Sequence, residues 1–457
     1  MRTLACLTLP AVLAGLIFAP PAAGQAKPRV QITDVRLGFP AGPFSRDLDE
    51  DGRARPLFKA AFFAPVYVDV QCNEAVEEPL RLVVSTADGT DVMHTYTVPL
   101  PPLSPGQTLS AVELPYLPYT KPGSFIAELE VSLHAGERRL GQPFTRTFFG
   151  LDPSEYLILT AGSRLPAFRL PPRPGAPEAD AADLGAVRLA AVEHARQLPD
   201  RWFGYEGVDL MILTTGGDEG RLVQDLFTLP ENRSRKAALL EWVRRGGRLL
   251  VSVGRSADVV VPLDEFQQIL PATIPPGGRR FADVIELRWV GVGDLARKQL
   301  RLRPGDGGQV PYAALQPRPD RAARALPQQS EPSPLIVQAP YGLGRVTLAG
   351  FDLDQPPFTE AESPGEFWQW LVNRSASRLP ERAADGTLPR DNRFRPGAVE
   401  SDLYLNTLQA NLEYFEGVPV VSFGWVALFI VLYILIIGPL DYLFLKKVVK
   451  RLEWTWV

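Results

Sequence analysis

The sequence predicts a multi-domain protein in which an all-β domain comes first, an α/β domain follows, and a transmembrane helix lies near the C-terminus. A chain of 457 residues is too long for one ordinary core. Short alternating apolar runs fill residues 28–150, and buried apolar runs alternate with helical patterns over residues 154–375. The 45 prolines and 38 glycines cluster between these periodic stretches, which favours short strands and linkers over long helices.

The first 26 residues have the order of a secretory signal peptide. Arg2 supplies a positive charge, residues 4–18 form an apolar run too short to span a bilayer comfortably, and small residues end the segment at Ala26. An uncleaved anchor is the alternative, whereas Cys6 lies too early for a lipoprotein. We therefore expect most of the chain to work outside the cytoplasm.

Cysteine and histidine are scarce in this chain. After loss of the signal peptide Cys72 is the one cysteine left, so no intramolecular disulfide is expected, and its strand-like surroundings predict a buried side chain. His94, His134 and His194 are scattered without metal-ligand spacing. We predict no metal site built on histidine or cysteine and no cofactor, while a site built on carboxylates alone stays open.

Residues 28–150 predict a sandwich of the immunoglobulin-like kind. Turn signals such as Pro105-Gly106 separate the apolar runs. The expected strands are Val30–Val35, Ala64–Val70, Leu80–Ser85, Met93–Val98, Phe125–Leu133 and Thr145–Phe149. Such domains are usually spacers or interaction platforms.

Residues 154–375 predict a mostly parallel sheet with helices. The expected strands are Tyr156–Thr160, Asp209–Thr215, Leu249–Val253, Val284–Val290 and a hairpin within Pro334–Asp354, while Val187–Val192 is left open between strand and helix. Ala238, Leu239, Trp242 and Val243 share one face of a helix that ends at Arg244-Arg245-Gly246-Gly247. A polar loop is expected around 303–334, and a closing helix begins near Phe367.

The region after residue 375 predicts a membrane anchor. A linker at 376–400 and an amphipathic juxtamembrane helix at 401–416 precede a charge-free apolar stretch at 418–440, which is long enough to span a bilayer. Lysines and arginines follow in the segment 441–457, which places this segment in the cytoplasm. Because the chain stops at RLEWTWV, we expect the sequence to be truncated or a further membrane helix to follow.

A family resemblance rests on the order DLMILTTGG, a helix, EWVRRGGRLLVSVG, and later YGLGRVTLAGFDLD. This order resembles the class I glutamine amidotransferase-like superfamily, especially the extracytoplasmic copies in large bacterial membrane proteins, and the tail GWVALFIVLYILIIGPLDYLFLKK is similar to their membrane segment. The resemblance covers roughly residues 154–455. It implies a flavodoxin-like α/β fold over residues 154–375.

The resemblance also implies where a catalytic site would lie. In true members a cysteine follows the strand equivalent to Leu249–Val253, and a later histidine activates it. Here Val253, Gly254, Arg255 and Ser256 follow that strand, and no histidine follows His194. We therefore predict no catalytic residue and no enzyme activity.

Several positions could nevertheless hold a ligand or the remains of a site. They are Gly216, Gly217, Asp218, Gly254, Arg255, Asp352 and Asp354. Asp352 and Asp354 would point the same way on an extended strand, and Ser252 or Ser256 could replace the missing nucleophile. An ordinary packed serine, a tight turn after Gly216 and exposed strand-end aspartates are the simpler explanations.

The predicted function is binding or scaffolding in the bacterial cell envelope by a pseudoenzyme anchored in the inner membrane by a single pass, with its bulk periplasmic. The expected partners are the lipid bilayer and envelope proteins, including von Willebrand A-type membrane proteins. A net charge of −4 without a basic stripe argues against nucleic acid. An envelope hydrolase with an unrecognised site and a small-molecule sensor are the alternatives.

Overall fold

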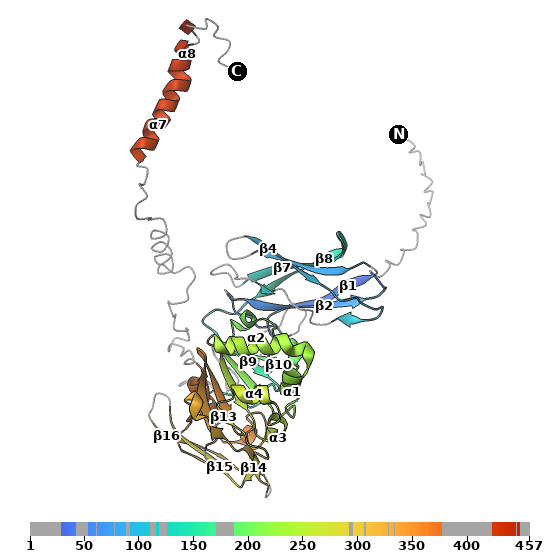
Figure 1. The fold of residues 1–457 in the computed structure, drawn as a ribbon, viewed down its shortest axis with the longest axis vertical. Helices are drawn as coiled ribbons and strands as arrows, with labels where there is room; N and C mark the ends of the chain where they lie inside the picture. Colours follow the sequence, from blue (N-terminus) through green and yellow to red (C-terminus); the bar gives the residue numbers. More distant parts are fainter. Residues whose placement is uncertain are drawn as a thin grey trace, which may run out of the picture. The chain divides into compact units, whose positions relative to one another are not determined.

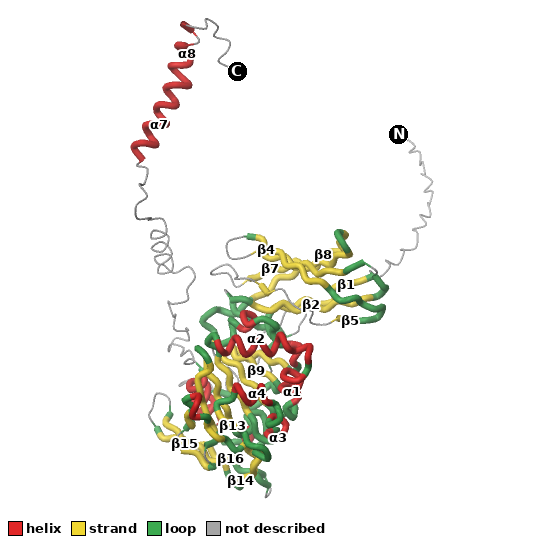
Figure 2. Tube along the Cα trace, in the orientation of Figure 1, coloured by secondary structure: helices red, strands yellow, loops and turns green. Residues whose placement is uncertain are grey.

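The computed structural model describes fifteen stretches of the chain. They are residues 29–42, 54–60, 62–76, 78–87, 92–109, 116–117, 126–170, 187–291, 296–305, 308–327, 329–332, 334–362, 364–376, 423–444 and 446–447. These residues are mostly β-sheet with few helices (Figure 1; Figure 2). The chain divides into two compact units, Met1–Arg395 and Pro396–Val457.

Two antiparallel sheets share one apolar core in the first part of the chain. One sheet contains β1 (Val30–Leu37), β2 (Ala64–Cys72), β5 (Thr108–Leu109) and β6 (Tyr116–Leu117). The other has the order β4-β3-β7-β8, formed by β4 (Met93–Pro99), β3 (Leu80–Ala87), β7 (Ile126–Ala135) and β8 (Arg138–Phe149). Alternate residues of both sheets, such as Val68 and Leu129, are buried in this core, as the period of two requires.

The six strands predicted in this region are confirmed. The last of them is longer than expected, since β8 begins at Arg138 and not at Thr145. Cys72 is a buried free thiol, as predicted, and its Sγ lies 3.2 Å from the carbonyl oxygen of Glu74.

A seven-stranded sheet follows, in the order β10-β9-β11-β12-β22-β21-β19. Its strands are β9 (Tyr156–Ala161), β10 (Val187–Val192), β11 (Leu210–Thr214), β12 (Arg248–Ser252), β19 (Arg324–Ala325), β21 (Ile336–Tyr341) and β22 (Gly344–Ala349). The first five strands in this order are parallel, β21 runs antiparallel to them, and β19 pairs antiparallel with β21 and so runs in the direction of the first five. The stretch left open between strand and helix is β10, and the predicted hairpin is β21 and β22.

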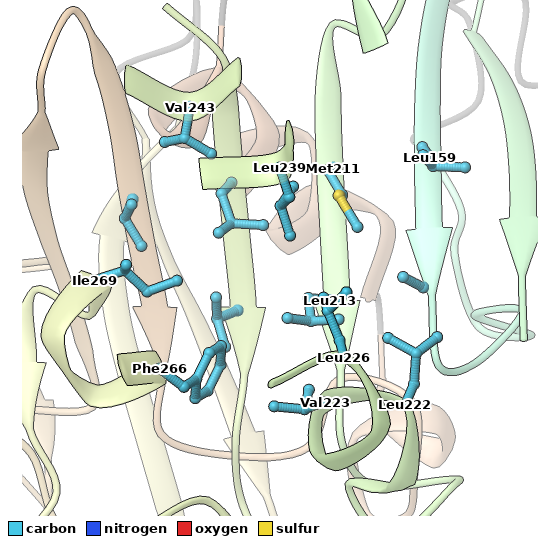
Figure 3. Close-up of a cluster of buried hydrophobic side chains, with 14 of the residues drawn as sticks. Leu159, Met211, Leu213, Leu222, Val223, Leu226, Leu239, Val243, Phe266 and Ile269 are labelled. Carbon is cyan, nitrogen blue, oxygen red and sulfur yellow. The ribbon is translucent and has the colours of Figure 1, made fainter. Parts of the chain in front are cut away.

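Helices cover both faces of this sheet. They are α1 (Arg221–Thr228), α2 (Arg233–Arg244), α3 (Ala257–Val260), α4 (Asp264–Ile269) and α5 (Pro364–Ser375), with 3-10 turns η2 (Ala195–Gln197), η3 (Trp202–Tyr205), η4 (Pro230–Asn232), η5 (Pro319–Arg321) and η6 (Phe358–Glu360). On one face α1, α2 and α4 bury side chains in one apolar cluster with β9, β11 and β12, and Figure 3 labels Phe266 and Ile269 of α4 in it. On the other face α5 buries Phe367 and Trp368.

Both helices that the sequence predicted in this region, the one that ends near Arg244 and the one near Phe367, are confirmed. The buried residues of α2 are the four that the 3.6-residue period selected. The closing helix predicted near Phe367 is α5, which begins three residues earlier.

The predicted loop around 303–334 is wrong. Four short strands lie entirely within it, namely β17 (Val310–Ala313), β18 (Gln316–Pro317), β19 and β20 (Gln329–Glu331). Strand β19 pairs with β21 in the seven-stranded sheet. The other three pair with β14 (Arg279–Ala282), β13 (Ala272–Thr273) and β15 (Ile285–Val290), and β15 also pairs with β16 (Arg297–Leu302). Strands of two to four residues are too short to show a period, so tertiary pairing defines them.

One apolar helical segment lies in the C-terminal unit. It runs from Phe423 to Phe444 through α7 (Phe423–Leu435), the π-helical turn η8 (Ile436–Leu440) and α8 (Asp441–Phe444). Its 22 residues and mean hydropathy of 2.5 would allow it to cross a membrane. The predicted signal peptide, the juxtamembrane helix, residues 418–422, nearly all of the linker and most of the segment after 441 lie outside the described residues.

Candidate functional site

The seven positions singled out from the sequence gather at one edge of the seven-stranded sheet. Gly216, Gly217 and Asp218 follow β11, Gly254 and Arg255 follow β12, and Asp352 and Asp354 follow β22. These strands are parallel neighbours, so their carboxyl ends meet. In α/β sheets this is the edge at which ligands usually bind.

Asp352 fastens the turn that follows β12. Its Oδ1 accepts a hydrogen bond from the Gly254 amide at 3.0 Å, and its Oδ2 accepts from the Arg255 amide at 3.1 Å and from Arg255 Nε at 3.0 Å. Asp352 is 5% exposed. A Cβ added at Gly254 would lie 2.6 Å from the carboxyl carbon of Asp352, so the close approach requires glycine.

Asp354 fastens the neighbouring turn, which follows β11. Its Oδ2 accepts from the Gly217 amide at 2.7 Å. Burial raises the pKa of Asp354 to about 6, the Gly217 amide opposes that rise, and the nearby charge of Asp352 adds to it. Its Oδ1 is buried, has no hydrogen-bond partner among the residues that the structure describes, and would lie 2.5 Å from a Cβ at Gly216.

Asp218 lies just before helix α1, which begins at Arg221. Its Oδ1 accepts from the Gly220 amide at 3.0 Å, and its Oδ2 accepts from the Leu222 amide at 2.9 Å. These contacts satisfy amides at the N-terminus of the helix. Together with the bond from Gly217 to Asp354, they support a tight turn held by the protein's own carboxylates.

The two serines considered as nucleophiles form hydrogen bonds to the protein backbone. Ser252 Oγ donates to the Phe351 carbonyl at 2.9 Å and accepts from the Leu353 amide at 3.0 Å. Ser256 Oγ donates to the Thr215 carbonyl at 2.6 Å. Both serines are buried, and the chain has no histidine after residue 194 that could activate them.

Asp352 and Asp354 follow a strand end, as the simpler explanation expected, but they are buried and not exposed, and the alternative of one extended strand is wrong. Strand β22 ends at Ala349, and the chain bends before both aspartates. The two carboxylates therefore reach different turns. Sequence reasoning also missed Thr215, whose Oγ1 donates to the Ser252 carbonyl at 3.0 Å. A threonine that continues an apolar strand gives no separate signal.

Other polar groups lie away from this edge. His194 follows β10, which lies two strands from β11 in the sheet, and its amide donates to Gln197 Oε1 at 3.0 Å. Within the described stretches no three histidine, cysteine, aspartate or glutamate side chains come together as metal ligands.

A pocket of about 90 Å³ belongs to the first domain and not to the strand ends. Arg36, Arg146 and Phe148 are among its lining residues. Arg36 pairs with Asp69 at 2.9 Å, and Arg146 lies 3.6 Å from Asp34, so carboxylates of the same domain already match these charges. We therefore place the candidate site at the strand ends.

Comparisons with known proteins give no assignment. No protein family and no curated protein matches the chain. Among solved structures, a calcium-binding mutant of β-glucuronidase 2 from Bacteroides uniformis is 11% identical and has a TM-score of 0.18, with 48% of this chain and 23% of that one covered. The putative ApaA protein from Bordetella pertussis is 14% identical with a TM-score of 0.14, covering 26% and 90%. Similarities this low carry no argument about function.

Proposed function

We propose that this chain is a membrane-anchored extracytoplasmic binding or scaffold protein of the bacterial cell envelope. In this proposal an immunoglobulin-like sandwich and a non-catalytic amidotransferase-like α/β domain precede a transmembrane helix. The observation that carries this proposal is that the aspartates at the strand ends bind the protein's own backbone. Asp352, Asp354 and Asp218 each accept backbone hydrogen bonds from a turn or a helix start.

Catalysis by the mechanism of true amidotransferases requires a nucleophile and a base at this edge. The positions after β12 are occupied by Val253, Gly254 and Arg255, and the last cysteine in the sequence is Cys72. Backbone amides that could stabilise an oxyanion, those of Gly254 and Arg255, already donate to Asp352. These hydrogen bonds make the turns at the strand ends rigid. A rigid surface of this kind suits recognition by a protein partner.

The membrane part of the proposal rests on the apolar helix. The stretch 418–440 carries no charge, and Lys446, Lys447, Lys450 and Arg451 follow it. Positive charge stays in the cytoplasm, so the domains before the helix would face outward. The signal-peptide pattern of residues 1–26 gives the same orientation independently.

The test combines fractionation with affinity purification of the full chain from a bacterial envelope. We expect the protein to stay with membranes through alkaline extraction and to leave them when residues 423–444 are deleted. After extraction in mild detergent we expect a stoichiometric envelope partner to co-purify. A membrane-bound chain that repeatedly purifies alone would contradict the scaffold proposal.

One observation favours a second candidate, an envelope hydrolase that uses Asp354. A buried carboxyl with a pKa near 6 and an unpartnered oxygen is typical of a general acid or base. Turnover of ester, amide or glycan substrates separates the two functions, with Asp354→Asn as the site variant and Ser256→Ala as a matched buried control. Activity that Asp354→Asn abolishes and Ser256→Ala retains would replace the scaffold proposal with the hydrolase.

A further inference from the structure

Three arginines lie on one face of the seven-stranded sheet, at the edge opposite the candidate site. Arg248 begins β12 and is the register partner of Arg345 near the start of β22. Arg324 in β19 pairs with Gln338, which in turn pairs with Thr347. Since residues 345 and 347 point to the same side of a strand, all three arginines share the face covered by α5.

These three charges lie close together, and the side-chain hydrogen bonds of Arg324 and Arg345 go to neutral acceptors. Arg345 Nη1 donates to the Arg374 carbonyl at 3.3 Å, and Arg324 Nη2 donates to Gln338 Oε1 at 3.4 Å. Burial lowers the pKa of Arg345, and the charges of Arg248 and Arg324 lower it further. Among the residues that the structure describes, none of the three arginines forms an ion pair with a carboxylate. Within the described residues, like charges thus lie together with no carboxylate paired to them.

More arginines extend the same edge. Arg244 and Arg245 end α2, next to the β21–β22 turn, where the Leu343 amide donates to the Arg244 carbonyl at 2.8 Å. Both share one carboxylate, Glu241, at 3.5 and 2.7 Å. Arg374 is exposed in the last turn of α5. We call these residues the arginine edge: Arg244, Arg245, Arg248, Arg324, Arg345 and Arg374.

The sequence that follows α5 carries more positive than negative charge. Residues 377–395 contain Arg378, Arg382, Arg390, Arg393 and Arg395 against Glu381, Asp385 and Asp391. Residues 376 and 423 are 47 positions apart in the sequence, a length that can span at most about 160 Å. This tether is long enough to let the arginine edge touch the bilayer that the apolar helix could enter.

We propose that the arginine edge binds the phosphate groups of anionic lipid headgroups in that bilayer. Guanidinium groups donate to phosphate in a bidentate way, and a row of them matches a negatively charged surface. The inference rests on the proposed membrane anchor and adds to it a second, reversible contact with the lipid. About 1 kcal/mol per arginine near an anionic surface corresponds to roughly fivefold each, so three arginines give about 100-fold in the docking equilibrium.

The experiment uses the full chain in lipid nanodiscs. A Leu343→Cys substitution in a Cys6→Ser background places a fluorophore in the β21–β22 turn, where Leu343 is 80% exposed and Cys72 is buried. A nitroxide on the lipid headgroup quenches the fluorophore when the edge touches the bilayer. We expect quenching in discs that contain phosphatidylglycerol, little in phosphatidylcholine alone, and reversal by high salt.

A triple variant, Arg248→Gln, Arg324→Gln and Arg345→Gln, should lose the quenching. The matched control, Arg280→Gln, Arg297→Gln and Arg303→Gln, removes the same charge elsewhere and should keep it. Equal quenching in both lipid compositions, or unchanged quenching in the triple variant, would overturn the proposal.

Two further outcomes separate the causes of failure. If inorganic phosphate changes the emission of the wild type but not of the triple variant, and anionic discs do not quench, the ligand is a soluble phosphate and the membrane source is wrong. A chain that does not enter nanodiscs contradicts the membrane anchor and this inference together. A chain that enters the discs without lipid-dependent quenching contradicts this inference alone.

Discussion

Asp354→Asn should stabilise the protein at neutral and alkaline pH. The carboxyl is 2% exposed, and burial raises its pKa from 3.8 to about 6. Because the folded state binds this proton more tightly than the unfolded state, Asp354 lowers stability as pH rises from about 4 to about 6, and the full cost remains above that range. Asparagine has nearly the same shape, cannot ionise, and can still accept from the Gly217 amide through Oδ1.

The size of the effect follows from the shift in pKa. A difference of about 2 units at about 1.36 kcal/mol per unit gives an upper limit of about 3 kcal/mol. For a domain of this size that corresponds to a rise in Tm of about 6–12 °C near pH 8 and almost no change near pH 4. The assay is thermal unfolding of the full chain in detergent, followed by tryptophan fluorescence across that pH range.

Asp352→Asn is the control for this prediction. Both oxygens of Asp352 accept hydrogen bonds, from Gly254 and from Arg255, so an amide would place NH2 against a donor. We expect a loss of about 2–4 kcal/mol at neutral pH. A loss of stability near pH 8 in Asp354→Asn, or a gain that does not depend on pH, would refute the argument that burial raises this pKa.

Two other predictions concern packing. Lys59 pairs with Asp209 at 2.5 Å and is 5% exposed, so Lys59→Met should cost about 3–5 kcal/mol in urea unfolding. Adding Asp209→Asn should recover much of this loss, and no recovery would show that the pair is not coupled. Gly254→Ala should destabilise by about 1–3 kcal/mol because its Cβ would overlap Asp352, whereas Gly305→Ala, with open space around it, should leave Tm nearly unchanged. Equal effects of the two alanines would contradict the proposed close contact.

The sequence predicted the elements that have a strong period. Buried parallel strands such as Tyr156–Ala161 are uniformly apolar, and the buried face of α2 recurs every three to four residues. The short strands between residues 303 and 334 escaped prediction, because two to four residues carry no period and their pairing depends on partners distant in the sequence.

The candidate site likewise combines features that the sequence predicted with features that only the structure shows. The sequence alone identified its residue types: glycines after two strands, two aspartates after a third, and no cysteine or histidine to form a nucleophile and base. Only the tertiary structure decided what the aspartates contact, because the bend after Ala349 sends Asp352 to the β12 turn and Asp354 to the β11 turn. The raised pKa of Asp354 is likewise a tertiary property, since it arises from burial and from the charge of Asp352, and a linear pattern specifies neither.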